Sequence, residues 1–211
     1  MARQFYSTNS PGELVGLKEA VLRSLPADNG LYMPEDVPCL GDGFWSGWRD
    51  WSFAELGYQV VSPLLDGAVP EDTLRAMVEE AVNFDAPLVP LVGGHHVLEL
   101  FHGPTLAFKD FGARFMARLM GWLTQGDERD LTVLVATSGD TGGAVASAFH
   151  EVPGTRVVVL YPKGKVSGLQ EKQLTTLGGN IVALEVEGTF DDCQRMVKAA
   201  FLDRGLSEAL N

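Results

Sequence analysis

The chain contains one lysine whose neighbours suit an amine nucleophile. Lys109 stands between Phe108 and Phe111 in the segment HGPTLAFKDFG, which runs from the end of a predicted strand into a predicted helix. Aromatic neighbours desolvate an ammonium group in part and so favour its neutral form, which can attack an aldehyde. None of the other five lysines has an aromatic residue beside it in the sequence. The alternative is a helix-start lysine whose stem covers an aromatic floor while its charge stays in water.

A second segment has the composition of an anion-binding loop. Residues 136–144 read ATSGDTGGA and again join a predicted strand to a predicted helix. Glycines let backbone amides converge, a helix N-terminus is the positive end of a dipole, and the hydroxyls of Thr137, Ser138 and Thr141 can donate. The segment lacks the lysine of a P-loop and the GxGxxG pattern, so a carboxylate suits it better than a nucleotide phosphate. The alternative is a turn in which Ser138 or Asp140 caps the helix.

Lys163 is a third candidate, because it follows a strand predicted over residues 157–161. From that position its ammonium group can reach a substrate phosphate as a point charge. The alternative is an ordinary solvated lysine.

A metal site is not expected. The nearest approach to a group of metal ligands is His95, His96, Glu99 and His102. On a strand, Glu99 points to the face opposite His96 and His102, so these side chains cannot converge on one ion.

The chain from residue 91 onward alternates between short β-branched runs and helical patterns. Strands are predicted over residues 97–101, 131–136, 157–161 and 181–186, and helices over residues 108–123, 141–149, 167–177 and 190–203. An Asp110/Arg114 pair supports the first helix, while Thr189 is the N-cap of the last and Gly205 lies just past its end. Successive units of this length indicate an α/β fold: a parallel sheet with helices on both faces and ligand sites at the C-terminal ends of its strands.

The first 90 residues indicate a mainly helical cap region. Apolar spacing predicts a helix over residues 13–22 and another from Pro70 to Val82. The tryptophans at positions 45, 48 and 51 are expected to pack in a core or loop. The PLVP stretch at residues 87–90 is the predicted boundary, because each proline removes a backbone donor. The expected domains are therefore residues 1–90 and 91–211.

Composition narrows the class of protein. A formal net charge of -12 argues against nucleic acid and anionic membranes as partners, because such a surface repels polyanions. The two cysteines, Cys39 and Cys193, have no disulfide or zinc-site spacing. The N-terminus has no signal-peptide pattern, and no stretch is long and apolar enough to span a bilayer. A reducing, cytoplasmic setting is expected.

Several motifs together resemble threonine synthase along the whole chain and in the family's order. They are YSTNSPGELVGLKEAVLRSLPADNGLYMPE, HGPTLAFKDF, ATSGDTGGA, LYPKGKVSGLQEKQLTTLGGN and VEGTFDDCQ. Related fold-type II pyridoxal phosphate (PLP) enzymes, the dehydratases and cysteine synthases, carry an SGN loop where this sequence has SGDTG. The resemblance therefore favours threonine synthase over them.

The resemblance implies a cofactor, a substrate and site residues. The cofactor is PLP, and O-phospho-L-homoserine is converted to L-threonine and phosphate. Lys109 matches the family's Schiff-base lysine, which also shuttles protons, with Phe108 and Asp110 beside it at the cofactor. The segment that holds the substrate carboxylate matches Thr137, Ser138, Gly139, Asp140 and Thr141.

The family pattern also extends beyond these residues. It includes a glycine-rich loop for the cofactor phosphate and a polar partner for the pyridine nitrogen, and neither is recognisable here. The chain is thus expected to be the N-terminal part of such an enzyme, inactive and prone to self-association on its own. Two alternatives stay open: a non-catalytic module that binds small anions or a partner chain, and another fold-type II lyase.

Overall fold

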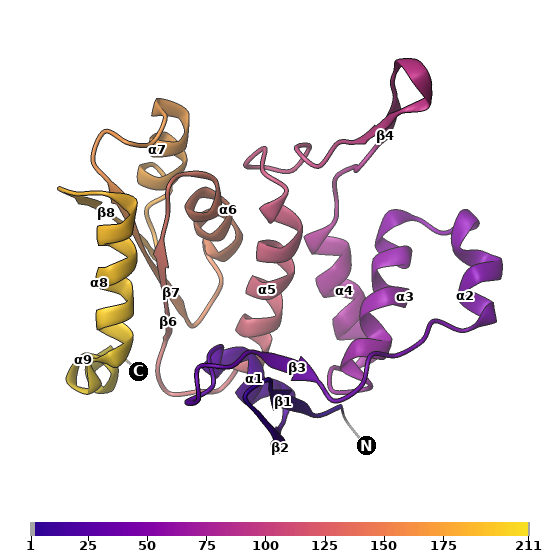
Figure 1. The fold of residues 1–211 in the computed structure, drawn as a ribbon, viewed down its shortest axis with the longest axis horizontal. Helices are drawn as coiled ribbons and strands as arrows, with labels where there is room; N and C mark the ends of the chain where they lie inside the picture. The colour runs from indigo at the N-terminus through magenta and orange to yellow at the C-terminus, as the bar shows by residue number, and fades with distance from the viewer. Residues whose placement is uncertain (1–2, 211) are drawn as a thin grey trace. The chain divides into compact units, whose positions relative to one another are not determined.

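The computed structural model describes residues 3–210, apart from the side chains of residues 204, 207 and 208, and divides into two compact units (Figure 1). The division falls between Asn83 and Phe84 rather than at the predicted 90/91 boundary. Residues after Asn83 join the second unit because β4 (Leu88–Pro90) pairs antiparallel with β5 (His96–Leu98). In addition, the Phe84 ring packs against Phe111 with centroids 4.7 Å apart.

The first unit combines a small antiparallel sheet with helices. The sheet has the order β2-β1-β3 and consists of β1 (Phe5–Ser7), β2 (Ser10–Val15) and β3 (Tyr32–Pro34). The helices are α1 (Leu17–Arg23), α2 (Asp42–Gly47), the 3-10 turn η1 (Trp48–Asp50), α3 (Phe53–Leu65) and α4 (Glu71–Ala81). The helical cap prediction missed this sheet.

The predicted helix over residues 13–22 is wrong in its first turn. Leu14 and Val15 belong to β2, where they pair with Tyr6 and Phe5, and the helix begins only at Leu17. Pairing with β1 satisfies the backbone groups that a helix would otherwise use, so the strand overrides the helical spacing. The predicted second helix is confirmed as α4, with Pro70 at its N-cap.

The second unit contains the predicted parallel sheet. Its strands β6 (Leu131–Ala136), β7 (Thr155–Pro162) and β8 (Ile181–Val186) pair in parallel in the order β6-β7-β8. Val157 on the central strand stands opposite Val133 on one side and Ile181 on the other, and it is completely buried. The predicted strand over residues 97–101 is not part of this sheet, because β5 ends at Leu98 and pairs with β4 instead.

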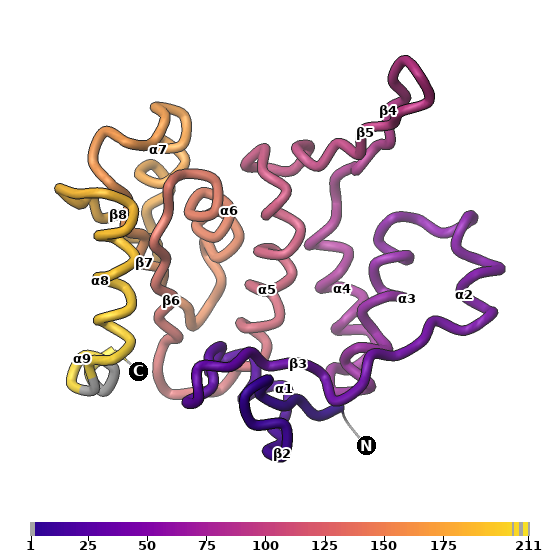
Figure 2. Tube along the Cα trace, in the orientation of Figure 1, coloured from indigo at the N-terminus to yellow at the C-terminus, as the bar shows by residue number. Residues whose placement is uncertain are grey.

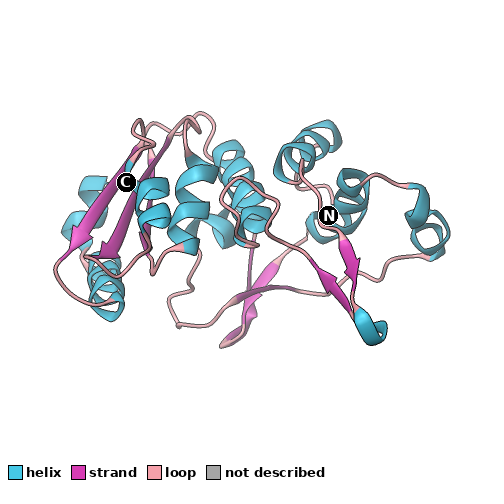
Figure 3. Cartoon of the chain, turned by 90° about the horizontal axis from the view of Figure 1, so that it is seen from above, coloured by secondary structure: helices cyan, strands magenta, loops and turns pink. Residues whose placement is uncertain are grey.

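Helices cover both faces of the parallel sheet, as predicted. The helices of this unit are α5 (Lys109–Leu123), α6 (Asp140–Phe149), α7 (Gly168–Thr175), α8 (Phe190–Leu202) and α9 (Arg204–Leu210). Figure 1 shows α8 on one face of the sheet and α6 on the other, with α5 packed outside α6. Figure 3 shows helices on both sides of the strands of this sheet. Figure 2 follows the alternation of strand and helix from α5 to α8. Gly205 does not end α8 as predicted but lies inside α9, because α8 stops where Asp203 becomes extended.

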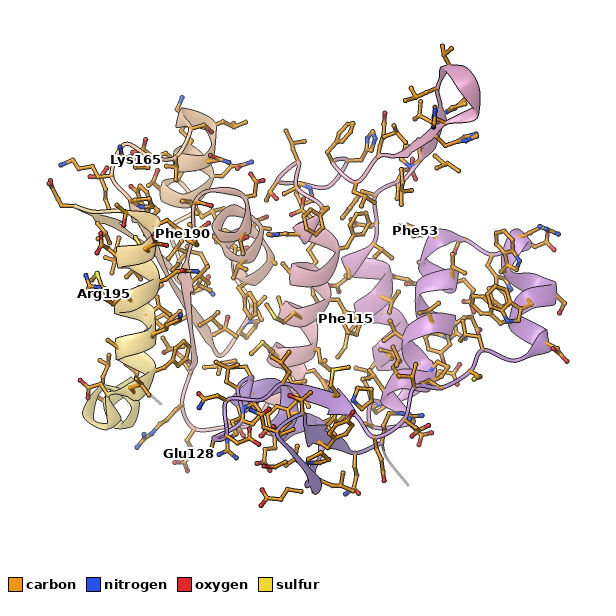
Figure 4. The ribbon with its side chains drawn as sticks, in the orientation of Figure 1. Phe53, Phe115, Glu128, Lys165, Phe190 and Arg195 are labelled. Atoms are coloured by element: carbon orange, nitrogen blue, oxygen red, sulfur yellow. The ribbon has the colours of Figure 1, made fainter. Side chains whose placement is uncertain are left out.

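Thr189 caps α8, as predicted. Its hydroxyl accepts from the Asp192 amide, and the Asp192 carboxylate accepts from the Thr189 amide at 2.9 Å. The same carboxylate accepts from Arg195, whose side chain projects from α8 away from the sheet (Figure 4). Within residues 3–210, no helix has the length and apolar character that crossing a membrane requires.

Candidate active site

Lys109 is the first residue of α5 and is half-buried. Its Nζ lies 4.2 Å from the centroid of the Phe108 ring, whose side chain is 60% exposed. This is a cation–π distance, and the ring face covers one side of the amine. The other aromatic neighbour in the sequence, Phe111, packs against Phe84.

The loop that leads into Lys109 has a constrained backbone. Leu106 has a positive φ of 61°, and its amide donates to the Gly103 carbonyl at 3.1 Å. A Cβ atom on Gly103 would lie 2.5 Å from Oδ2 of Asp110 and 2.9 Å from Cζ of Phe84. Only glycine therefore fits at position 103, and the turn places the following residues against α5.

Asp110 lies behind this loop and is fully buried. Its Oδ2 accepts from the Thr105 amide at 2.9 Å, and its Oδ1 accepts from the Thr105 hydroxyl at 2.6 Å. A buried carboxylate requires such partners, and here the loop supplies them. The resemblance implies that Asp110 lies at the cofactor; in the structure, the hydrogen bonds of its carboxylate hold the loop before Lys109.

Thr137 organises the loop between β6 and α6. Its side chain is 1% exposed, and its Oγ1 accepts from the amides of Gly139 and Gly142 at 2.9 and 2.8 Å. The capping alternative assigned this task to Ser138 or Asp140, and neither performs it, because the N-cap is Gly139 and lacks a side chain. The Thr137 hydroxyl is thus used inside the loop, and its predicted contact with the substrate has no support from this geometry.

The exposed side of the same loop carries unused donors. Ser138, Asp140 and Thr141 are exposed, and the first turn of a helix leaves its amides without intrahelical partners. The Asp140 carboxylate is turned to α7, where its Oδ1 accepts from Gln170 Nε2 at 2.7 Å. What remains for an anion is the start of α6 with the hydroxyls of Ser138 and Thr141.

Comparison with known proteins assigns this arrangement to a family. Residues 87–207, which include both loops, match the pyridoxal-phosphate dependent enzymes. The chain belongs to this family. Residues 4–82 match the threonine synthase N terminus, so the resemblance noted in the sequence is confirmed over both units.

The relatives of this pyridoxal-phosphate dependent enzyme include threonine synthases. The chain is 46% identical over 205 residues to that of Haemophilus influenzae, covering 97% of this chain and 47% of the relative. It is 42% identical over 207 residues to that of Escherichia coli, covering 98% and 48%. The solved structure of PLP-bound threonine synthase from Brucella melitensis aligns with a TM-score of 0.91 at 38% identity, over 99% of this chain and 46% of that one. The chain thus spans about half the length of the relatives it matches.

In this pyridoxal-phosphate dependent enzyme, Lys163 follows β7 and is already paired. Its Nζ lies 2.6 Å from Oε1 of Glu187 and 4.0 Å from Oε2 of Glu185, both at the end of β8. Parallel strands bring these residues to one edge of the sheet, which sequence reasoning did not use. A phosphate at Lys163 would have to compete with Glu187 for the ammonium group.

The histidine-rich segment departs from the expected strand geometry. Glu99 Oε2 lies 2.7 Å from Nε2 of His102, although alternation would have separated them. The strand ends at Leu98, so the period of two does not reach these residues. Within its described part, the structure holds no group of three or more His, Cys, Asp or Glu side chains that could hold a metal ion.

Sequence reasoning missed the glutamines of α7. Gln170 Nε2 binds Asp140, and Gln173 Nε2 donates to the Thr105 carbonyl at 3.2 Å. The Ser167…Gln170 spacing is that of a capping box, a signal that could have marked the start of this helix. The sequence has no comparable signal for Gln173.

Proposed function

We propose that this chain forms the lysine-bearing part of a threonine synthase that uses PLP to convert O-phospho-L-homoserine and water to L-threonine and phosphate. The position of Lys109 carries the proposal: a half-buried amine on the face of Phe108, in a family defined by an aldehyde cofactor. The threonine synthases of Haemophilus influenzae and Escherichia coli, at 46% and 42% identity, support the choice of substrate.

The residues of the second unit fit PLP and an amino-acid substrate. The Lys109 amine can hold an aldehyde covalently, and the Phe108 ring keeps water from one side of that amine. When bound, PLP supplies an electron sink for the chemistry at the substrate's carbons. Lys109 then takes a proton from one substrate carbon and returns it to another, which requires its Nζ to stay close to the substrate.

The loop at the start of α6 is the proposed carboxylate site. The first-turn amides of Asp140 and Thr141 and the hydroxyls of Ser138 and Thr141 would donate to the substrate carboxylate. Gly139 has a φ of 143°, a backbone conformation that residues with a side chain rarely adopt, and the space beside it is filled by Gln170. Thr137 and Asp110 are assigned supporting parts, because the partners of both lie inside their own loops.

Lys163 is proposed only as a second contact to the substrate phosphate. Its exposed amine can turn from Glu187 to a phosphate, because a surface ion pair contributes at most about 1 kcal/mol. Its role is separate from that of Lys109.

The class of enzyme and its setting are part of the same proposal. We assign the chain to fold-type II, since its parallel α/β unit carries the lysine at the start of a helix. A reducing cytoplasm suits the free thiols of Cys39 and Cys193. A net charge of -12 speaks against nucleic acid or an anionic membrane as partner.

The exposed side chains of Val182 and Leu184 on β8 support self-association of the isolated 211 residues, which light scattering would detect.

The test traps the cofactor on its lysine. The complete gene product is loaded with PLP, reduced with borohydride and digested, and the mass of the pyridoxyl group is expected on the peptide that contains Lys109. Lys109→Ala should remove the label, while the control variant Lys165→Ala should keep it. Phosphate release from O-phospho-L-homoserine is measured beside ammonia release from L-serine and L-threonine.

Each alternative has its own outcome in this test. Label on Lys163 or Lys165 would overturn the assignment of Lys109. Ammonia release without phosphate release would make the protein a fold-type II lyase of the dehydratase kind. Anion binding with neither label nor turnover would support the non-catalytic module.

A further inference from the structure

Two glutamines of α7 reach the two loops of the candidate site. Gln170 Nε2 donates to Oδ1 of Asp140 at 2.7 Å, and Gln173 Nε2 donates to the Thr105 carbonyl at 3.2 Å. Side chains three residues apart lie on one face of a helix, so one face of α7 contacts both the loop before Lys109 and the loop before α6. Neither glutamine was among the predicted site residues.

The glutamines also fill the space beside two glycines. A Cβ atom on Gly139 would lie 2.4 Å from Cδ of Gln170, and one on Gly143 would lie 3.3 Å from Oε1 of Gln173. Both side chains are half-buried. They therefore pack directly on the backbone of the loop and of the first turn of α6, and their amides are held by these contacts as well as by hydrogen bonds.

The orientation of the Gln170 amide is fixed at both ends. Its Oε1 accepts from the Ser167 amide at 2.9 Å in the capping box of α7, which leaves its Nε2 for Asp140. This matters because the Asp140 carboxylate stands at the N-terminus of α6, where it competes with any anionic ligand for the positive end of the helix. Gln170 draws that carboxylate to α7 and leaves the first-turn amides to the ligand.

We propose that Gln170 and Gln173 are positioning residues, and that α7 acts as a brace which sets the anion loop (residues 137–143) and the Lys109 loop (residues 103–110) relative to each other. Gln170 restrains residues 137–143 through its hydrogen bond to Asp140, and Gln173 restrains residues 103–110 through its hydrogen bond to Thr105. The functional part of this inference rests on the proposed function, whereas the bracing itself does not.

Hydrogen exchange of the complete gene product without ligands tests the bracing. Gln170→Glu retains the capping box, since glutamate accepts equally from the Ser167 amide, but it cannot donate to Asp140. It should speed exchange about tenfold in residues 137–143 and leave residues 103–110 unchanged. Gln173→Met keeps the length of the side chain without its donor and should show the opposite pattern. Glu171→Gln, an exposed change on the same helix, should alter neither segment.

A swapped pair gives the decisive control. In the double variant Gln170→Glu with Asp140→Asn, the new amide can donate to the new carboxylate, so the contact returns with donor and acceptor exchanged. Exchange in residues 137–143 should return to the rate of the parent protein. Equal effects of both single variants on both segments, or failure of the swap to restore protection, would overturn the brace.

Kinetics with O-phospho-L-homoserine and borohydride trapping of PLP test the functional part. Gln170→Glu should raise KM about tenfold with little change in kcat, because the substrate carboxylate meets an unrestrained Asp140. Gln173→Met should instead lower kcat and slow the labelling of Lys109. Altered exchange with unchanged kinetics and labelling would overturn the positioning role. If the variants show the expected exchange pattern but the parent protein releases no phosphate, the proposed function is overturned and the brace is still supported.

Discussion

Thr105 binds the buried carboxylate of Asp110 twice, through its amide at 2.9 Å and its hydroxyl at 2.6 Å. The contact closes the turn that contains Leu106 with its positive φ and ends directly beside Lys109. A lysine that must hold an aldehyde and move protons requires a fixed backbone, and this contact provides it.

Replacing Thr105 by valine should therefore weaken both the fold and the site. Thr105→Val keeps the hydrogen bond from the backbone amide to Asp110 but removes the one from the hydroxyl. The buried carboxylate thus loses one partner, at a cost of about 1–3 kcal/mol. The free energy of unfolding from urea denaturation should fall by that amount, and trapping of PLP at Lys109 should slow. Thr105→Ser, which keeps the hydroxyl, is the control. Equal stability of the valine and serine variants would show that the hydroxyl bond does not hold the turn.

Substitution of two threonines in the anion loop should affect different properties, stability for Thr137 and substrate binding for Thr141. Thr137→Val deprives the amides of Gly139 and Gly142 of their acceptor and should lower the free energy of unfolding by about 1–3 kcal/mol. Thr141 is exposed at the start of α6, so Thr141→Val should leave stability nearly unchanged and raise KM for O-phospho-L-homoserine. Urea denaturation and initial rates separate the two effects. A Thr141→Val protein that unfolds more easily but binds substrate normally would make Thr141 a structural residue as well.

The glycines of the site make a matched pair for a backbone test. Gly139 has a φ of 143°, and an added Cβ would lie 2.4 Å from Gln170, so Gly139→Ala should destabilise the protein by about 1–3 kcal/mol. Gly112 lies in the interior of α5 with nothing within 4 Å of an added Cβ. Gly112→Ala should stabilise by about 0.5–1 kcal/mol, because alanine suits a helix interior better than glycine. Thermal unfolding should thus shift in opposite directions, and a common direction would contradict the strain assigned to Gly139.

Local patterns predicted the parallel unit well, because its elements are long and follow one period. The strands β6 and β8 begin and end at the predicted residues, and Thr189 caps α8 as expected. Segments whose structure depends on distant partners were predicted less well. Val15 pairs with Phe5, and Leu88 pairs with Leu98, so the local spacing of neither segment determines its structure.

The candidate site shows the same limit. The identities of Lys109 and of the loop at residues 137–141 were visible as motifs, because glycines, hydroxyls and an aromatic-flanked amine have direct chemical meanings. The sequence did not show which polar groups form hydrogen bonds within the protein and are therefore not available to a ligand. The side-chain amide of Asn180, for example, donates to the carbonyls of Phe149 and Thr155. Asn180 therefore ties the end of α6 to β7, and only the fold reveals this.

The capping box of α8 should make the stability of the protein depend on pH in acid. The Arg195 guanidinium, together with the amide and hydroxyl of Thr189, lowers the pKa of Asp192 from its ordinary value of 3.8 to about 2. A carboxyl with a lowered pKa in the folded protein binds fewer protons there than in the unfolded chain. Its contribution to stability is therefore complete above pH 3.8 and is lost as the pH falls through about 2. Stability should decline in this window, and in Asp192→Asn this part of the decline should be absent.

Arg195→Met gives the matched control, because it removes the largest cause of the shift and leaves both Thr189 bonds in place. The pKa of Asp192, followed by NMR of its carboxyl carbon, should rise towards 3.8 in this variant. Urea denaturation between pH 2 and pH 7 should show that the parent and the Asp192→Asn protein differ most at neutral pH and converge as the carboxyl becomes protonated. A difference that stays constant down to pH 2 would mean that Asp192 stabilises α8 through packing or neutral hydrogen bonds rather than through its charge.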